Sequence, residues 1–111
     1  MAQWDVYANP SVRTRNDLPY LVVVQSDLLA SLSTRLVVPL ARSQGTAAGL
    51  PRSLAPVFEI AGEPVFLLSQ EAGPIDMRLL RQPLASLRSE AHKIIDALDA
   101  VISGIRHGPT D

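Results

Sequence analysis

Three side chains near the end of the sequence have a spacing that could bind a metal ion or move a proton. His92, Asp96 and Asp99 lie at positions i, i+4 and i+7, so a helix would place them on one face. No second histidine or glutamate completes a ligand set, and a solvated helix face explains the same pattern. We therefore favour the solvated face and predict no metal and no cofactor.

Motifs for nucleophilic catalysis and phosphate binding are also missing. Neither histidine, His92 or His107, belongs to a Ser–His–Asp arrangement. The glycines of the segment Gly45–Gly49 have no lysine beside them and follow no strand-to-helix pattern. The absence of cysteine excludes disulfides and cysteine-based zinc sites. We predict no catalytic residue.

Seven arginines are spread over predicted loops and strand ends, where they could bind phosphates or an acidic partner. They are Arg13, Arg15, Arg35, Arg42, Arg52, Arg78 and Arg81. Their spacing alone favours the simpler explanation that they keep the surface solvated. The formal net charge is −1, from 10 basic and 11 acidic residues, so no overall field would hold nucleic acid nonspecifically.

Two adjacent leucines, Leu28 and Leu29, follow the polar segment Gln25–Asp27. In a strand they cannot both face the core, so one of them could be exposed for a partner. A bulge that buries both is the alternative, and the residues alone leave the two possibilities open.

The first half of the chain predicts strands that would position these residues. Trp4–Ala8 alternates apolar and polar side chains, with Trp4 and Val6 facing inward. Tyr20–Gln25 is rich in β-branched residues and predicts a central strand. Arg35–Leu40 predicts another, in which Pro39 suggests an edge or a bulge.

The second half continues with a hairpin and a further strand. Val57–Ile60 and Val65–Leu68 flank a turn in which Gly62 can adopt a positive φ. Ile75–Leu80 is expected as a last strand. The segment Ser43–Pro51, with small residues and glycines, is predicted to be flexible.

The segment Leu87–Ile105 predicts an amphipathic helix, with Ser86 as its N-terminal cap and Gly104 as its stop. Apolar side chains recur at spacings of three and four and predict one apolar stripe: Leu87, Ala91, Ile94, Ile95, Leu98, Val101, Ile102 and Ile105. Strands followed by one helix predict an antiparallel sheet packed by a helix. No linker divides residues 1–111, so we expect one domain, with 106–111 as a flexible tail.

The start of the chain, Met1–Pro10, lacks the basic residues and apolar run of a secretory signal. The longest aliphatic run, Leu21–Val24, is too short to cross a bilayer. We expect a soluble cytoplasmic protein with no membrane contact.

Several motifs occur in an order that resembles the CcdB family of toxins. Val22–Leu29 contains V-Q-S-D before two aliphatic residues, and Arg35–Leu40 reads R-L-V-V-P-L where the family has R-x-V-I-P-L. Pro56–Ile60 is similar to a P-V-x-x-I strand, and Ser103–Ile105 stands where the family often has W-G-I. The resemblance covers nearly the whole chain.

The resemblance implies a mainly β fold, an SH3-like antiparallel barrel with a small extra sheet and one long C-terminal helix. It also implies a homodimer that binds the A subunit of DNA gyrase and traps the enzyme on cleaved DNA. A CcdA-like antitoxin would neutralise the toxin with a disordered tail that folds on binding. The two proteins would repress their operon together, so the toxin would meet DNA only through the antitoxin.

The resemblance also assigns sites. Gyrase-binding positions carried over are Leu28, Leu29, Asp99, Ser103, Gly104 and Ile105, and the antitoxin would bind Arg13, Arg15 and Arg42. Two features depart from the family: Ser103 replaces an aromatic residue, and the chain continues through 106–111 where relatives usually stop. Asp99 adds a charge where relatives often have an amide.

Two other functions are open on the same fold. The barrel is shared with MazF- and Kid-type toxins that cleave mRNA, for which Arg78, Arg81 and His92 would be the candidate residues. A non-toxic relative could serve only as an antitoxin-bound component of a repressor, as Ser103 and the tail suggest.

Overall fold

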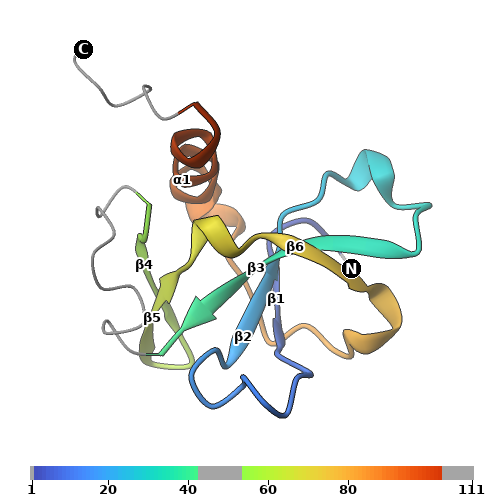
Figure 1. The fold of residues 1–111 in the computed structure, drawn as a ribbon, viewed down its shortest axis with the longest axis horizontal. Helices are drawn as coiled ribbons and strands as arrows, with labels where there is room; N and C mark the ends of the chain where they lie inside the picture. The colour runs from blue at the N-terminus through green and yellow to red at the C-terminus, as the bar shows by residue number, and fades with distance from the viewer. Residues whose placement is uncertain (1, 43–53, 104–111) are drawn as a thin grey trace.

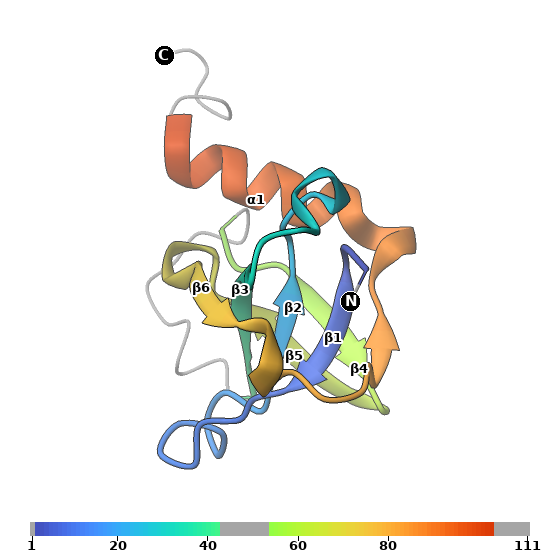
Figure 2. The same ribbon diagram turned by 90° about the vertical axis from the view of Figure 1, so that its right-hand side faces the viewer.

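The computed structural model describes residues 2–42 and 54–103, which form a nearly closed antiparallel barrel with one helix across its end (Figures 1 and 2). The strands are β1 (Asp5–Ala8), β2 (Tyr20–Val23), β3 (Thr34–Ala41), β4 (Val57–Ile60), β5 (Glu63–Leu67), β6 (Gly73–Asp76) and β7 (Ala85–Ser86). Their order in the sheet is β4-β5-β3-β2-β1-β7, and β6 branches off by pairing with β3. The expected mainly β fold, with a barrel, a small additional pairing and a C-terminal helix, is confirmed.

The long strand β3 is an inner strand, so the edge position expected for Pro39 is wrong. On one side β3 pairs with β2, where Pro39 lies opposite Leu21. On its other side, β3 pairs with β6 over residues 34–37 and with β5 at Leu40 and Ala41. The Pro39 carbonyl accepts from the Leu68 N–H at 3.0 Å on that second side. The backbone N and O of one strand residue point to the same side, so an N–H at position 39 would also face that second side. Proline has no N–H there, and it stands at the point where the neighbour of β3 changes from β6 to β5.

Side chains from the strands and from α1 meet in the barrel interior and form the main apolar cluster. Trp4 and Val6 lie in it as expected, together with Val22, Val38, Leu40, Ile60, Val65 and Leu67. A second cluster on the other face of the sheet contains Tyr7, Leu21, Val23, Val37 and Leu80. Strands covered on both faces need apolar residues at successive positions, which explains the unbroken aliphatic run of β2. Trp4 precedes β1 with φ of +78°, a left-handed conformation fixed by its buried ring.

The hairpin of β4 and β5 is confirmed, whereas the expected strand Ile75–Leu80 is misplaced. Ala61 and Gly62 take φ values of 53° and 80° in the hairpin turn, as a two-residue turn requires. The actual strand β6 begins earlier, at Gly73, and ends where the Asp76 side chain caps the 3₁₀ turn η4 (Met77–Leu79). The short strand β7 was not anticipated from the sequence.

The C-terminal helix begins as a 3₁₀ turn, η5 (Arg88–Glu90), and continues as α1 (Ala91–Ser103). The N-cap position is Leu87, which has no side-chain cap, and not Ser86 as predicted; the Ser86 hydroxyl still accepts from the Arg88 N–H at 3.2 Å. Three other predictions, the helix stop at Gly104, the flexible segment Ser43–Pro51 and the tail 106–111, fall outside the described residues.

The buried face of α1 is narrower than the predicted stripe. Ile94 and Ala97 are fully buried, but Ile95 and Ile102 lie along the edge of the stripe and are exposed. Val101 lies two turns after Ile94 on the same face, yet 41% of its surface is exposed against 0% for Ile94. The barrel therefore supports the first turns of α1 more than the last, and the apolar stripe is buried only in part.

Candidate protein-binding surfaces

The loop between β2 and β3, residues 26–34, exposes a group of leucines that we call the leucine loop. Leu28 is 93% exposed, and Leu29 and Leu32 are about half exposed. The first two lie in the 3₁₀ turn η1 (Asp27–Leu29), whose Leu28 N–H donates to the Ser26 hydroxyl at 3.1 Å. A bulge that buries both leucines is therefore wrong, and so is a strand, because a capped helical turn points them into solvent.

Two polar side chains at the base of the leucine loop bind its backbone. Arg35 is only 5% exposed, and its guanidinium donates to the carbonyls of Leu32 (2.6 Å), Thr34 (2.9 Å) and Ala30 (3.1 Å). Gln25 donates to the carbonyls of Leu29 and Thr34, both at 3.1 Å, and accepts from the Leu36 N–H. The backbone that carries the exposed leucines is thus already held by hydrogen bonds. A partner that binds the leucines would therefore pay little conformational entropy for ordering the loop.

The second apolar surface is formed by the last turns of α1. Ile102 is 84% exposed, and Val101 and Ser103 are exposed beside it. Asp99 is half buried and makes an interaction of its own. Asp99 and Ser103, one turn apart, share a face of the helix. Of the other carried-over positions, Gly104 and Ile105 lie outside the described residues.

A single protomer keeps these two surfaces apart. In Figure 1 the turn η1, in cyan, lies at the upper right of the molecule and α1 at the upper left. The structure therefore brings Leu28 and Leu29 together and Asp99 and Ser103 together, but it does not join the two pairs. Sequence reasoning did not identify Leu32 and Ile102 as members of these exposed surfaces. The signal for Leu32 was a third leucine just beyond Leu28 and Leu29. The signal for Ile102 was an apolar stripe wider than one buried helix face.

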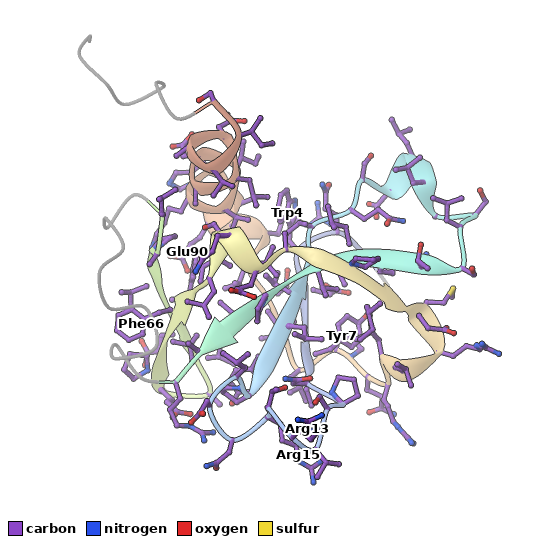
Figure 3. All side chains as sticks on the ribbon, viewed as in Figure 1. Trp4, Tyr7, Arg13, Arg15, Phe66 and Glu90 are labelled. Carbon is purple, nitrogen blue, oxygen red and sulfur yellow. The ribbon has the colours of Figure 1, made fainter. Side chains whose placement is uncertain are left out.

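The arginines have different environments. Arg13 and Arg15 are exposed on the loop between β1 and β2, at the end of the molecule opposite α1 (Figure 3). Arg42 donates to a Glu63 carboxylate oxygen and to the Asn16 carbonyl, both at 2.8 Å, so it fastens that loop to the start of β5. Arg35 supports the leucine loop. Arg52 lies outside the described residues.

Three titratable groups among the described residues have clearly shifted pKa values, and they lie on separate elements. Hydrogen bonds from the side chain and then the backbone N–H of Arg78 lower the pKa of Asp76 to about 2, and Asp76 in turn raises the pKa of Arg78. Burial, followed by the charge of Asp5, raises the pKa of Tyr7. His92 stands on α1, on a different element from Arg78. Within residues 2–42 and 54–103 no three metal-binding side chains converge.

The described part of the chain also contains no helix that is long and apolar enough to span a membrane. What the barrel offers instead is exposed leucine and isoleucine on two surfaces and arginines on a third. These features define a small β-barrel protein suited to contacts with other macromolecules.

Comparison with known proteins places this barrel in a family. Residues 3–104 match the model of the CcdB protein family, which is nearly the whole 111-residue chain, and the chain therefore belongs to the CcdB family. Members of this family are the toxins of toxin–antitoxin modules, so the protein is such a toxin. None of the curated proteins compared with the chain matches it.

Proposed function

We propose that the protein binds the A subunit of DNA gyrase as a homodimer and inhibits the enzyme without catalysing a reaction itself. The observation that carries the proposal is the exposure of Leu28 and Ile102, two large apolar side chains at or beside the positions that the family resemblance assigns to gyrase binding. Large apolar groups in water favour a partner that buries them, at about 2 kcal/mol for a fully buried side chain.

The replacement of the family's aromatic residue by Ser103 leaves the neighbouring residues to supply apolar contact. An interface Trp can contribute 2 kcal/mol or more, according to the usual magnitude of such contacts. Ile102 and Val101 offer aliphatic surface on the same turns of α1. A two-fold dimer presents each surface twice, which compensates for a weaker contact on each copy.

We further propose that an antitoxin with an acidic tail neutralises the protein through Arg13, Arg15 and Arg42. The first two guanidinium groups are exposed, and that of Arg42 is half exposed beside Glu63. Charge-assisted hydrogen bonds to carboxylates would hold such a tail as it folds onto the barrel. The complex, rather than the toxin alone, would bind operator DNA in the cytoplasm.

A supercoiling assay tests the gyrase proposal. Purified protein should inhibit supercoiling or stabilise cleaved DNA, and Leu28→Ser and Ile102→Ser should each weaken the inhibition by about tenfold. Val12→Ser is the matched control, because Val12 is exposed on the loop at the opposite end of the molecule from α1. No effect of the unmodified protein at micromolar dimer rejects gyrase as the target.

Two further measurements separate the alternatives. Cleavage of labelled RNA by the same preparation would favour an endoribonuclease and contradict a toxin that acts by binding alone. Unimpaired growth after induction of the protein without its antitoxin would favour a repressor component that is no longer toxic.

A further inference from the structure

An open pocket of about 540 Å³ lies between the loop that follows β1 and the segment that follows η4. Arg15 and Arg81 face it from these two segments, and Pro10, Leu79 and Leu84 supply apolar walls. Its size is that of sites that hold small ligands or a few residues of a peptide. No residue carried over from the family resemblance lies in it except Arg15.

The two arginines of the pocket carry unneutralised charge. Neither guanidinium makes a hydrogen bond or ion pair with any residue in 2–42 or 54–103, in contrast to Arg42 and Arg78, which pair with carboxylates. No acidic residue lines the pocket. Two cations that share one concave surface attract an anion, and each can bind a carboxylate through two parallel N–H groups.

Both walls of the pocket are anchored to the barrel. On one side, the Asn9 side chain donates to the Thr14 hydroxyl at 3.0 Å and the Leu18 carbonyl at 2.8 Å, which fixes the turn that carries Arg15. On the other side, the Leu84 N–H donates to the Val6 carbonyl at 2.7 Å. The pocket is therefore formed before a ligand arrives, which lowers the entropy cost of binding.

A neighbouring pocket provides an internal comparison. It contains Arg13, but Asp17 and Glu71 line it as well. These two carboxylates offset the positive charge there and would repel an acidic ligand. Of the two pockets, the one with Arg15 and Arg81 is the better site for an anion.

We propose that the pocket of Arg15 and Arg81 binds an acidic polypeptide segment, with a carboxylate held between the two guanidinium groups and an adjacent apolar side chain packed on Leu79 and Leu84. The apolar walls favour a peptide over a nucleic acid, because no aromatic side chain lines the pocket for a base to stack on. The inference rests on the proposed function only in taking this segment to be part of the antitoxin's acidic tail.

Fluorescence anisotropy with a short labelled peptide that alternates glutamate and leucine tests the site. The protein should bind this peptide, and Arg81→Glu should weaken binding by about tenfold or more, since a charge-assisted contact becomes a repulsion. Leu84→Ser should weaken it severalfold. Arg88→Glu is the matched control, because it makes the same charge change outside the pocket and should alter affinity by less than about twofold.

Three results would overturn the inference. They are failure of the unmodified protein to bind the peptide, equal weakening of peptide binding by Arg81→Glu and Arg88→Glu, and equally tight binding of a peptide with serine in place of leucine. Displacement of the peptide by a short single-stranded DNA, with the same dependence on Arg81, would also reject a peptide site. Peptide binding without gyrase inhibition leaves this inference standing and rejects the gyrase proposal, whereas gyrase inhibition without peptide binding does the reverse.

Discussion

The leucine loop and the last turns of α1 both expose large apolar side chains, but different causes keep them in solvent. In the loop, buried Arg35 and half-buried Gln25 bind the backbone carbonyls and hold the turn that carries Leu28. In α1, the regular helix fixes the backbone, and the exposure of Val101 compared with Ile94 marks where support from the barrel decreases.

The difference teaches that one exposed apolar surface depends on tertiary structure and the other on a single helix. Loss of a buried polar side chain should disturb the loop and leave α1 intact. Loss of a surface side chain on α1 should affect binding and leave the fold intact. The variants below test this contrast.

Arg35→Met should give the largest effect. Its guanidinium makes three hydrogen bonds to carbonyls, and we expect the free energy of unfolding to fall by about 3 kcal/mol, less than the sum of three charged hydrogen bonds because water can reach the freed carbonyls. Urea unfolding measures the loss, and hydrogen exchange should accelerate at amides 26–34 but not in α1. Arg13→Met, at an exposed arginine of the loop between β1 and β2, is the control and should leave stability nearly unchanged.

Lys93→Met should have a smaller effect, on the helix side of the comparison. The Lys93 ammonium donates to the Val57 carbonyl at 3.0 Å, pairs with Glu90 at 2.9 Å and lies 4.5 Å from the centre of the Phe58 ring. Its removal should cost about 1 kcal/mol, because the ion pair is partly exposed and solvent weakens it. Equal stability of the variant and the parent would show that α1 docks through apolar packing alone.

Asp76→Asn should reveal a pH dependence at the base of the leucine loop. Asp76 caps η4, whose Met77 N–H donates to the Ser33 carbonyl. The folded pKa of Asp76, about 2, is below its ordinary value of 3.8, so its ionisation stabilises the fold above that value and this contribution is lost as the pH falls toward 2. Urea unfolding should therefore separate the variant from the parent by more at pH 5 than at pH 2, where Asp76 of the folded parent is already partly protonated. A separation as large at pH 2 as at pH 5 would contradict this assignment.

Ile102→Ser should have the smallest effect on stability, below about 0.5 kcal/mol, because the side chain is already in water. Under our proposal it still weakens gyrase inhibition. A large loss of thermal stability would instead mean that Ile102 is buried, for example within a stable dimer, in which case the change should also alter the dimer's sedimentation.

Strands β1 to β5 were predictable because alternating or β-branched runs and the Gly62 turn are local signals, whereas β6 was misplaced and β7 missed. Pro39 shows the limit of such signals: proline marks a break in hydrogen bonding, but only the packed sheet reveals that the break is a change of partner within an inner strand. The width of the buried face on α1 likewise depends on where the barrel ends, and the helical spacing of apolar residues carries no information about that.

The candidate surfaces were predictable only in part. The pair Leu28 and Leu29 was identified from the sequence and is exposed, whereas Arg35 looked like any other surface arginine. Its burial depends on carbonyls of a loop that has to fold back over it, and no spacing in the sequence encodes that geometry. Arg81 lines the same pocket as Arg15 but is distant from it in sequence. Only the closure of the barrel brings the two side chains to one surface.

Trp4 gives the protein a built-in optical probe. It is the only tryptophan in the chain, its indole is buried in the cluster that joins the barrel to Leu87 and Ile94, and its carbonyl accepts from the Leu87 N–H at 2.9 Å. Its emission should shift to the red when helix and barrel separate, as the ring enters water. Since the leucine loop and the end of α1 contain no tryptophan, emission spectra can follow the integrity of the core while a tryptophan-free ligand occupies either surface.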